Sequence, residues 1–131
     1  MAKPRVLFLC VHNAGRSQMA AALMEKIAGE RVVVETGGSE PAASIHPNVT
    51  AAMAEKGIDL TRQPRKFERA DVEAADVVIT MGCGDECPYV PGKRYEDWQV
   101  ADPSGEDADT TRAIRDDIEA RVRALASSLG V

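Results

Sequence analysis

Short apolar runs mark the strands that this chain is expected to form. Arg5–Cys10 (RVLFLC) and Asp76–Met81 (DVVITM) are almost wholly apolar, as in strands buried on both faces of a parallel sheet. Arg31–Glu35 (RVVVE) predicts another strand, closed by Thr36-Gly37-Gly38. Tyr95–Trp98 predicts a short one within an otherwise irregular, Gly-, Pro- and Asp-rich stretch. Four strands are therefore expected.

Between the strands the apolar period changes to that of a helix. In the first such segment apolar residues recur at i, i+3, i+4 and i+7, which places them on one helical face. Pro47 and Gly57 bracket a second segment in the usual order of proline first and glycine last. Thr110 or Thr111 is expected to cap the last helix. The expected helices are Ser17–Gly29, Pro47–Gly57, Arg69–Ala75 and one whose apolar stripe runs from Ile114 to Leu129.

The alternation of strands and helices predicts the fold class. It implies an α/β domain over residues 1–131, with a four-stranded parallel sheet and helices on both faces. Ligands of such sheets bind beyond the carboxyl ends of the strands, where the strand order reverses. Cys10 ends the first strand and Cys83 follows the third. Two thiols from distant parts of the sequence are thus expected at one edge of the sheet.

Composition narrows the class of partner. The chain has 131 residues and a net charge of −5 without a basic block, which argues against nucleic-acid binding. The apolar run Val6–Val11 is too short for a signal peptide or a membrane span, so no membrane is expected and the location expected is the cytoplasm. Thiols are kept reduced there. Three cysteines cannot all pair within one chain.

The segment Cys10–Ser17 (CVHNAGRS) has the residue types of an oxyanion site. Backbone N–H groups of a tight loop at a helix N-terminus form a concave anion site. Arg16 offers a planar fork for two oxygens, and the same field favours a thiolate on Cys10. Ser17 can donate a hydrogen bond to that sulfur. The residues expected to hold the anion are Val11, His12, Asn13, Ala14, Gly15 and Arg16.

These cysteines could also have a purely structural or a metal-binding role. Cys10 could be an inert residue at the end of a buried strand, although the whole Cys-x5-Arg-Ser pattern between a strand and a helix favours a nucleophile. A zinc site would need about four ligands. The three cysteines with His12 and His46 could reach that number, but they lack paired spacing. No metal is therefore expected, and His12 is taken as an exposed spacer.

The motifs resemble those of a known family. The loop, its setting and the chain length resemble low-molecular-weight tyrosine phosphatases. Cys10–Ala20 (CVHNAGRSQMA), Cys83–Pro88 (CGDECP) and Trp98–Gly105 (WQVADPSG) are more specifically similar to the arsenate reductases built on that fold. The resemblance implies that Cys10 attacks arsenate and that Cys83 and Cys87 resolve the adduct as a disulfide.

The same resemblance implies further roles and a partner. Asp102, before Pro103, would be a general acid, and Asn13 would brace the loop. The implied reductant is external: thioredoxin is favoured, and mycothiol or glutathione with a mycoredoxin or glutaredoxin-like protein is an alternative. No bound cofactor is expected. Some relatives bind potassium through an acidic residue on the first helix, where this chain has Ala21.

Two other functions stay open at this point. A low-molecular-weight tyrosine phosphatase would need no second thiol, but such enzymes usually follow the Asp-Pro pair with aromatic residues, and here Ser104 and Gly105 follow. A sensor of oxyanions or arsenic would bind without turnover. Arg62, Arg65 and Lys66 are basic residues that could approach the anion or dock a redox partner, although a solvated basic loop is the favoured interpretation.

Overall fold

Four parallel strands form the centre of the molecule in the computed structural model, which describes residues 3–82 and 89–131. Their order in the sheet is β2-β1-β3-β4, and the expected fold class is confirmed. The elements, in chain order, are β1 (Arg5–Cys10), α1 (Arg16–Ala28), the short 3-10 helix η1 (Gly29–Arg31), β2 (Val33–Gly38), α2 (Pro47–Ala54), α3 (Arg69–Ala74), β3 (Val77–Met81), β4 (Arg94–Asp97) and α4 (Ala108–Leu129).

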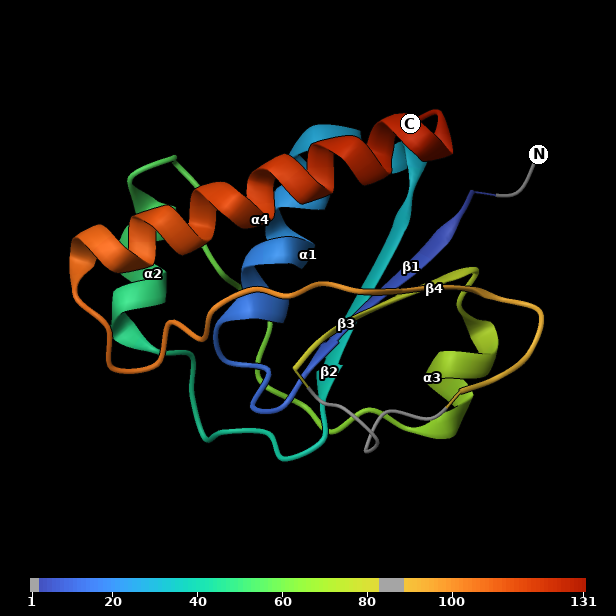
Figure 1. Ribbon diagram of the computed structural model, residues 1–131, viewed down its shortest axis with the longest axis horizontal. Coiled ribbons are helices and arrows are strands. Elements are labelled where there is room, and N and C mark those ends of the chain that lie inside the picture. Colours follow the sequence, from blue (N-terminus) through green and yellow to red (C-terminus); the bar gives the residue numbers. More distant parts are fainter. Residues whose placement is uncertain (1–2, 83–88) are drawn as a thin grey trace.

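Helices cover both faces of the sheet because β1 is apolar on both sides. Val6, Phe8 and Cys10 face the larger core, which α1, α2 and α4 cover. Leu7 and Leu9 face a smaller core that also contains Val72 of α3. Figure 1 shows α1 and α4 on one side of the sheet and α3 on the other. The unbroken apolar run of β1 is therefore explained by a strand sandwiched between two helical layers.

The strand order makes β1 the point where the chain changes direction across the sheet. Cys10 pairs in register with Gly38 of β2 on one side and Met81 of β3 on the other. The connection after β1 leads to β2 at one edge, and the chain then crosses to β3 on the opposite side of β1. The carboxyl end of β1 is thus the position at which folds of this class bind ligands.

Several predicted boundaries were wrong. β2 spans Val33–Gly38, so Thr36, Gly37 and Gly38 belong to the strand and do not close it. These glycines serve close approach: a Cβ on Gly37 would lie 2.8 Å from the Phe67 side chain. The cap of α4 is Asp107, whose carboxylate accepts a hydrogen bond from the Thr110 amide at 2.7 Å.

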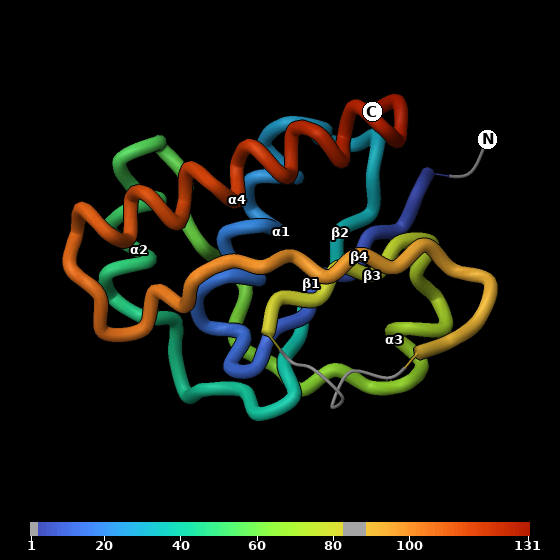
Figure 2. Tube along the Cα trace, viewed as in Figure 1, coloured from blue at the N-terminus to red at the C-terminus, as the bar shows by residue number. Residues whose placement is uncertain are grey.

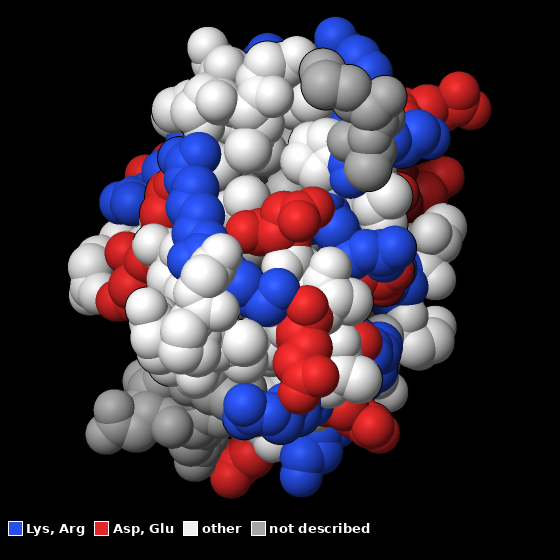
Figure 3. Space-filling model, turned by 90° about the vertical axis from the view of Figure 1, so that its right-hand side faces the viewer, with Lys and Arg blue, Asp and Glu red and all other residues white. Residues whose placement is uncertain are grey.

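Charges of both signs are interspersed on the surface. On the face shown in Figure 3, basic and acidic side chains of the described residues alternate. Many of them pair, for example Arg69 with Glu73 at 3.0 Å, one helical turn apart on α3. Within residues 3–82 and 89–131, no helix combines the length and the apolar character that crossing a membrane requires.

Candidate active site

The loop that follows β1 is held from outside by its carbonyl groups. The segment after β2 donates its amides to the loop: Ser39 to the Cys10 carbonyl at 3.2 Å, Glu40 to that of Val11 at 2.8 Å and Ala42 to that of His12 at 2.9 Å. The C=O and the following N–H of a trans peptide point in opposite directions. The N–H groups of this loop therefore face away from the 39–42 segment, and that of Asn13 points at the Cys10 sulfur, 3.3 Å away.

The close packing of this loop requires glycine at position 38. A Cβ on Gly38 would lie only 2.5 Å from the Val11 carbonyl oxygen, so a larger residue would push the loop away from β2. Helix α1 begins at Arg16, directly after the loop, and its first amides have no carbonyl partner within the helix. The Asn13 amide and the first turn of α1, through Ser17, thus lie beside the Cys10 sulfur, an arrangement that favours an anion.

The Cys10 thiol lies at that point. Its side chain is buried, its sulfur accepts the Asn13 amide at 3.3 Å, and it lies 2.9 Å from the Ser17 hydroxyl oxygen. The Ser17 oxygen also accepts a hydrogen bond from Asn13 Nδ2 at 2.7 Å. With that acceptor position occupied, the Ser17 hydrogen is free to be donated to the sulfur. Ser17 is therefore oriented as a donor to a Cys10 thiolate.

Asn13 connects the loop to two neighbouring segments. Its backbone has a φ of 51°, a left-handed conformation that Asn tolerates better than most residues. Nδ2 donates to Thr36 Oγ1 at 2.7 Å as well as to Ser17, and Oδ1 accepts the Arg65 amide at 3.1 Å. These partners fix which atom of the amide is oxygen. The structure accordingly gives Asn13 the bracing contacts that the resemblance implied.

Arg16 lies beside the loop with most of its side chain enclosed. Its side chain is only 12% exposed, and Nη1 donates to the Val100 carbonyl at 3.3 Å. A Cβ on Gly82 would lie 2.7 Å from Nη1, so the chain leaving β3 passes close to this group. Arg16 Nη2 lies 3.8 Å from Asp102 Oδ2. Three segments that are distant in sequence therefore meet at the Arg16 guanidinium.

Asp102 approaches the loop from the segment between β4 and α4. This segment, residues 98–107, crosses from β4 to the start of α4 in Figure 2. Asp102 is exposed, and its Oδ1 accepts the Ser104 amide at 3.0 Å. Pro103 is buried, and a Cβ on Gly15 would lie 2.8 Å from its ring. The carboxylate thus stands at the rim of the site while the next residue packs against the loop.

The other predicted residues are placed as follows. His12 is exposed, in keeping with a spacer. The Arg65 guanidinium donates hydrogen bonds to the Thr36 carbonyl at 2.7 Å and to Asp71 at 2.7 Å. These two partners hold it, so it is not directed at an anion in the loop. Cys83 and Cys87 lie outside the described residues. Among the described residues, no three His, Cys, Asp or Glu side chains are grouped as metal ligands would be.

Sequence reasoning missed Thr36 as a site residue. The Thr36 hydroxyl contacts the Asn13 amide in a fully buried position, but its sequence context, Thr-Gly-Gly, looked like the end of a strand. A buried threonine that directly precedes two strand glycines was the available signal. It was hidden because glycines usually indicate turns.

Known proteins match this chain over most of its length. The family model described as low molecular weight phosphotyrosine protein phosphatase matches residues 5–131. A candidate arsenate reductase of Halobacterium salinarum is 41% identical over 88% of this chain and 85% of that protein. A glutaredoxin arsenate reductase of Synechocystis is 33% identical over 95% of this chain and 98% of that protein.

Solved structures similar to this chain also include an arsenate reductase. A thioredoxin-dependent arsenate reductase of Corynebacterium glutamicum is 45% identical, with a TM-score of 0.88 over 98% of this chain. This chain spans 62% of that protein's length. An arginine phosphatase of Geobacillus stearothermophilus is 28% identical, with a TM-score of 0.82 over 97% of this chain and 93% of that one. The chain belongs to the low molecular weight phosphotyrosine protein phosphatase family, in its arsenate reductase branch.

Proposed function

We propose that this protein is a cytoplasmic arsenate reductase that acts as one domain over residues 1–131. The observation that carries the proposal is the surroundings of the Cys10 sulfur, which accepts the Asn13 amide and lies 2.9 Å from Ser17 Oγ. A backbone amide and a hydroxyl on a buried thiol, next to the N-terminus of α1 and Arg16, support a nucleophile and an anion cradle in one place. The arsenate reductases among its relatives support arsenate as the substrate.

In the first step arsenate binds with its oxygens on the loop amides and the Arg16 guanidinium. The Cys10 thiolate attacks arsenic, an As–O bond breaks, and the departing oxygen leaves as water. Asp102 would supply a proton to that oxygen as general acid. Its position at the rim, 3.8 Å from Arg16, supports this role. The product is an adduct in which Cys10 Sγ is bonded to arsenic(V), and no redox change has yet occurred.

In the second step another thiol reduces arsenic. Its sulfur attacks Cys10 Sγ, the S–As bond breaks, and the electron pair goes to arsenic, which becomes arsenic(III) and leaves as arsenite. Two thiols are oxidised to one disulfide. We propose Cys83 as the attacking thiol and Cys87 as the thiol that then displaces Cys10. Gly82, which precedes Cys83, lies against Arg16, and this position supports the assignment.

An external dithiol must then reduce the disulfide. We propose thioredoxin, because three cysteines suffice for an internal disulfide that a dithiol protein can reduce and because a relative of 45% identity is thioredoxin-dependent. The glutaredoxin-linked relative from Synechocystis is the reason to test a small-thiol route as well.

The proposal is tested by measuring arsenite formed by the purified protein. Turnover is compared with thioredoxin and thioredoxin reductase, with glutathione and glutaredoxin, and with mycothiol and mycoredoxin. Cys10→Ser should form no arsenite with any of them. Cys83→Ser, which lacks the attacking thiol, and Cys87→Ser should each be limited to at most one turnover with thioredoxin. Repeated turnover by both single variants would refute the relay, and no arsenite from the native protein would refute the function.

Phosphate-ester hydrolysis is the second candidate, because the family model and the arginine phosphatase structure share this fold. A phosphatase uses Cys10, Arg16 and Asp102 but no second thiol. A Cys83/Cys87 double variant should therefore retain full turnover of a phosphorylated substrate. Rapid hydrolysis by that variant, with slow arsenite formation by the native protein, would favour this candidate.

A further inference from the structure

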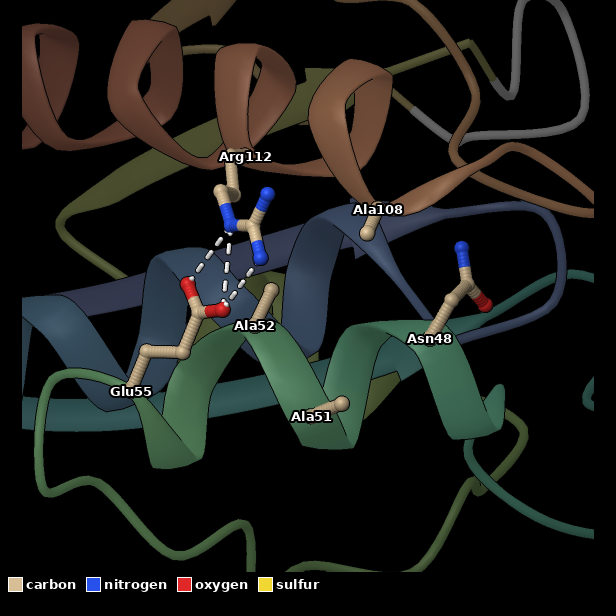
Figure 4. Close-up of a pocket in the computed structure, with 6 residues that line it drawn as sticks. All are labelled: Asn48, Ala51, Ala52, Glu55, Ala108 and Arg112. Atoms are coloured by element: carbon tan, nitrogen blue, oxygen red, sulfur yellow. Dashed lines mark hydrogen bonds and ion pairs between the residues drawn. The ribbon is translucent and has the colours of Figure 1, made fainter.

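Asn48 of α2 ties together two segments that lie on either side of Asp107. Its Nδ2 donates to the Pro103 carbonyl at 2.7 Å and to Thr111 Oγ1 at 2.9 Å. The Glu106 carbonyl lies at the limit of hydrogen bonding, 3.5 Å away. An amide nitrogen carries two hydrogens, and the two short contacts account for both. Figure 4 shows Asn48 on α2 opposite Ala108, the first residue of α4.

The partners of Asn48 are themselves fixed. Thr111 is fully buried and donates its hydroxyl to the Asp107 carbonyl at 2.7 Å, so it is part of the first turn of α4. Arg112, one residue further, pairs at 2.8 Å with Glu55, the C-cap residue of α2. The start of α4 is thus anchored to α2 at two places, and Asn48 adds the 102–106 loop to this unit.

Pro103 connects the Asn48 contact to the anion loop, because its ring packs against Gly15. Its ring packs where a Cβ of Gly15 would be, at 2.8 Å, and His46 lies on the same spot at 3.4 Å. The proline is therefore held between Gly15 on one side and the Asn48 amide on its carbonyl. Because a proline ring fixes its own φ, the direction in which the chain enters Pro103 is also fixed.

The contacts of Pro103 with Asn48 and Gly15 determine where the preceding residue, Asp102, lies. It is exposed and contacts the protein through the Ser104 amide at 3.0 Å and, more loosely, through Arg16 at 3.8 Å. Neither contact ties the loop to the body of the protein on the α2 side. The Asn48–Pro103 bond does so one residue away, and it leaves the carboxylate itself free to face a substrate.

We propose that Asn48 is a positioning residue, which holds Asp102 over the anion loop through the Pro103 carbonyl. The proposal rests on the general-acid role of Asp102 given above. Without the Asn48 donor, the loop would detach from α2 and Asp102 would sample positions in which its proton does not reach the departing oxygen. Displacements of about 1 Å in catalytic groups can cost on the order of 100-fold in rate.

The test is a double-mutant cycle on the full chain. Arsenite formation is followed in a single turnover, with enzyme in excess over arsenate and dithiothreitol as the thiol. Asn48→Ala is expected to lower the rate by about 10- to 100-fold, within the range of a general acid, with arsenate affinity unchanged. In an Asp102→Asn background the same change should have no further effect, because its path runs through Asp102. Multiplying losses would overturn the proposal.

Thr111→Val is the matched control. It removes the other short contact of Asn48 and leaves the bond to Pro103, so its rate should stay within about twofold of the native protein, since a rate this close corresponds to under about 0.5 kcal/mol in barrier. A loss equal to that of Asn48→Ala would show that Asn48 acts only by anchoring α4. If Asn48→Ala does not fold, Asn48→Asp keeps the shape, removes the donor and carries the same expectation.

Amide hydrogen exchange separates this proposal from the proposed function. Ser104 and Glu106 donate within the loop, to Asp102 Oδ1 at 3.0 Å and to the Pro103 carbonyl at 3.1 Å. Their amides should exchange faster in Asn48→Ala and at the native rate in Thr111→Val. Unchanged exchange in Asn48→Ala would overturn the positioning role whatever the substrate. Native protein that forms no arsenite would instead refute the reductase function.

Discussion

Replacement of Asn13 by alanine separates what holds the anion loop from what performs the chemistry. Asn13 is fully buried and makes three side-chain hydrogen bonds, to Ser17, Thr36 and the Arg65 amide. Its backbone has a φ of 51°. Alanine keeps none of these hydrogen bonds and is strained in that conformation, whereas glycine loses the same bonds but tolerates the backbone. The two variants together resolve the two contributions.

The expected magnitudes follow from these contacts. A buried hydrogen bond contributes about 1 kcal/mol net, and leaving its partners unpaired costs more. Asn13→Gly should therefore lower the free energy of unfolding by about 3 kcal/mol. Asn13→Ala should lose about 1 kcal/mol more, because a left-handed backbone costs that much for a residue with a Cβ. The free energy of unfolding of such a domain is about 5–15 kcal/mol in total, so both variants should still fold at low temperature.

Urea unfolding followed by circular dichroism measures the stability, and single-turnover arsenite formation measures the chemistry. Both variants should lose rate by at least about tenfold even where they are fully folded, because Ser17 is no longer oriented by Asn13. Thr36→Val, which removes one of the three bonds, is the control and should lose about 1 kcal/mol. The reasoning would be refuted by a loss in Asn13→Ala below about 1 kcal/mol, or by alanine and glycine variants of equal stability.

Three further changes test other parts of the structure. Ser39 Oγ is buried without a hydrogen-bond partner among the described residues, so Ser39→Ala should raise the free energy of unfolding by about 1 kcal/mol; a decrease in urea midpoint would contradict this. Asp107→Ala removes the cap of α4 and should lower the melting temperature, whereas Asp107→Asn, which can still cap, should keep it. Hydrogen bonds from Arg112 and Arg115 lower the pKa of Glu55 to about 2 from 4.5. Its stabilising pairs are complete above pH 4.5 and are lost as the pH falls toward 2, so Glu55→Gln should flatten the acid side of the stability profile; an unchanged profile would refute this.

Much of the architecture was accessible from the sequence. The run Arg5–Cys10 is apolar at every position after the first, which only a strand buried on both faces explains. The stripe of α4 was equally clear, because Ile114, Ile118, Val122 and Leu125 are all buried. Since both ends of the anion loop are set by such elements, the approach of Ser17 to Cys10, 2.9 Å apart, could be predicted as well.

The rest depended on contacts that local patterns do not encode. Gly37 and Gly38 suggested a turn, whereas they allow Phe67 and Val11 to approach β2. The cap of α4 was assigned to a threonine because Asp107, Thr110 and Thr111 are all good caps, and only packing decides among them. Asn48 stands second in a helix and carries no motif, and its partners lie more than 50 residues away in the sequence.

The central place of β1 in the sheet also bears on how the molecule opens. Cys10 lies on a strand that is paired on both sides, whereas Asp102 is an exposed residue of the connection that follows the edge strand β4. Local unfolding starts from exposed connections and reaches central strands last. Spontaneous opening should thus release Asp102 before it disturbs Cys10, and partial opening would leave the thiol enclosed and chemically protected.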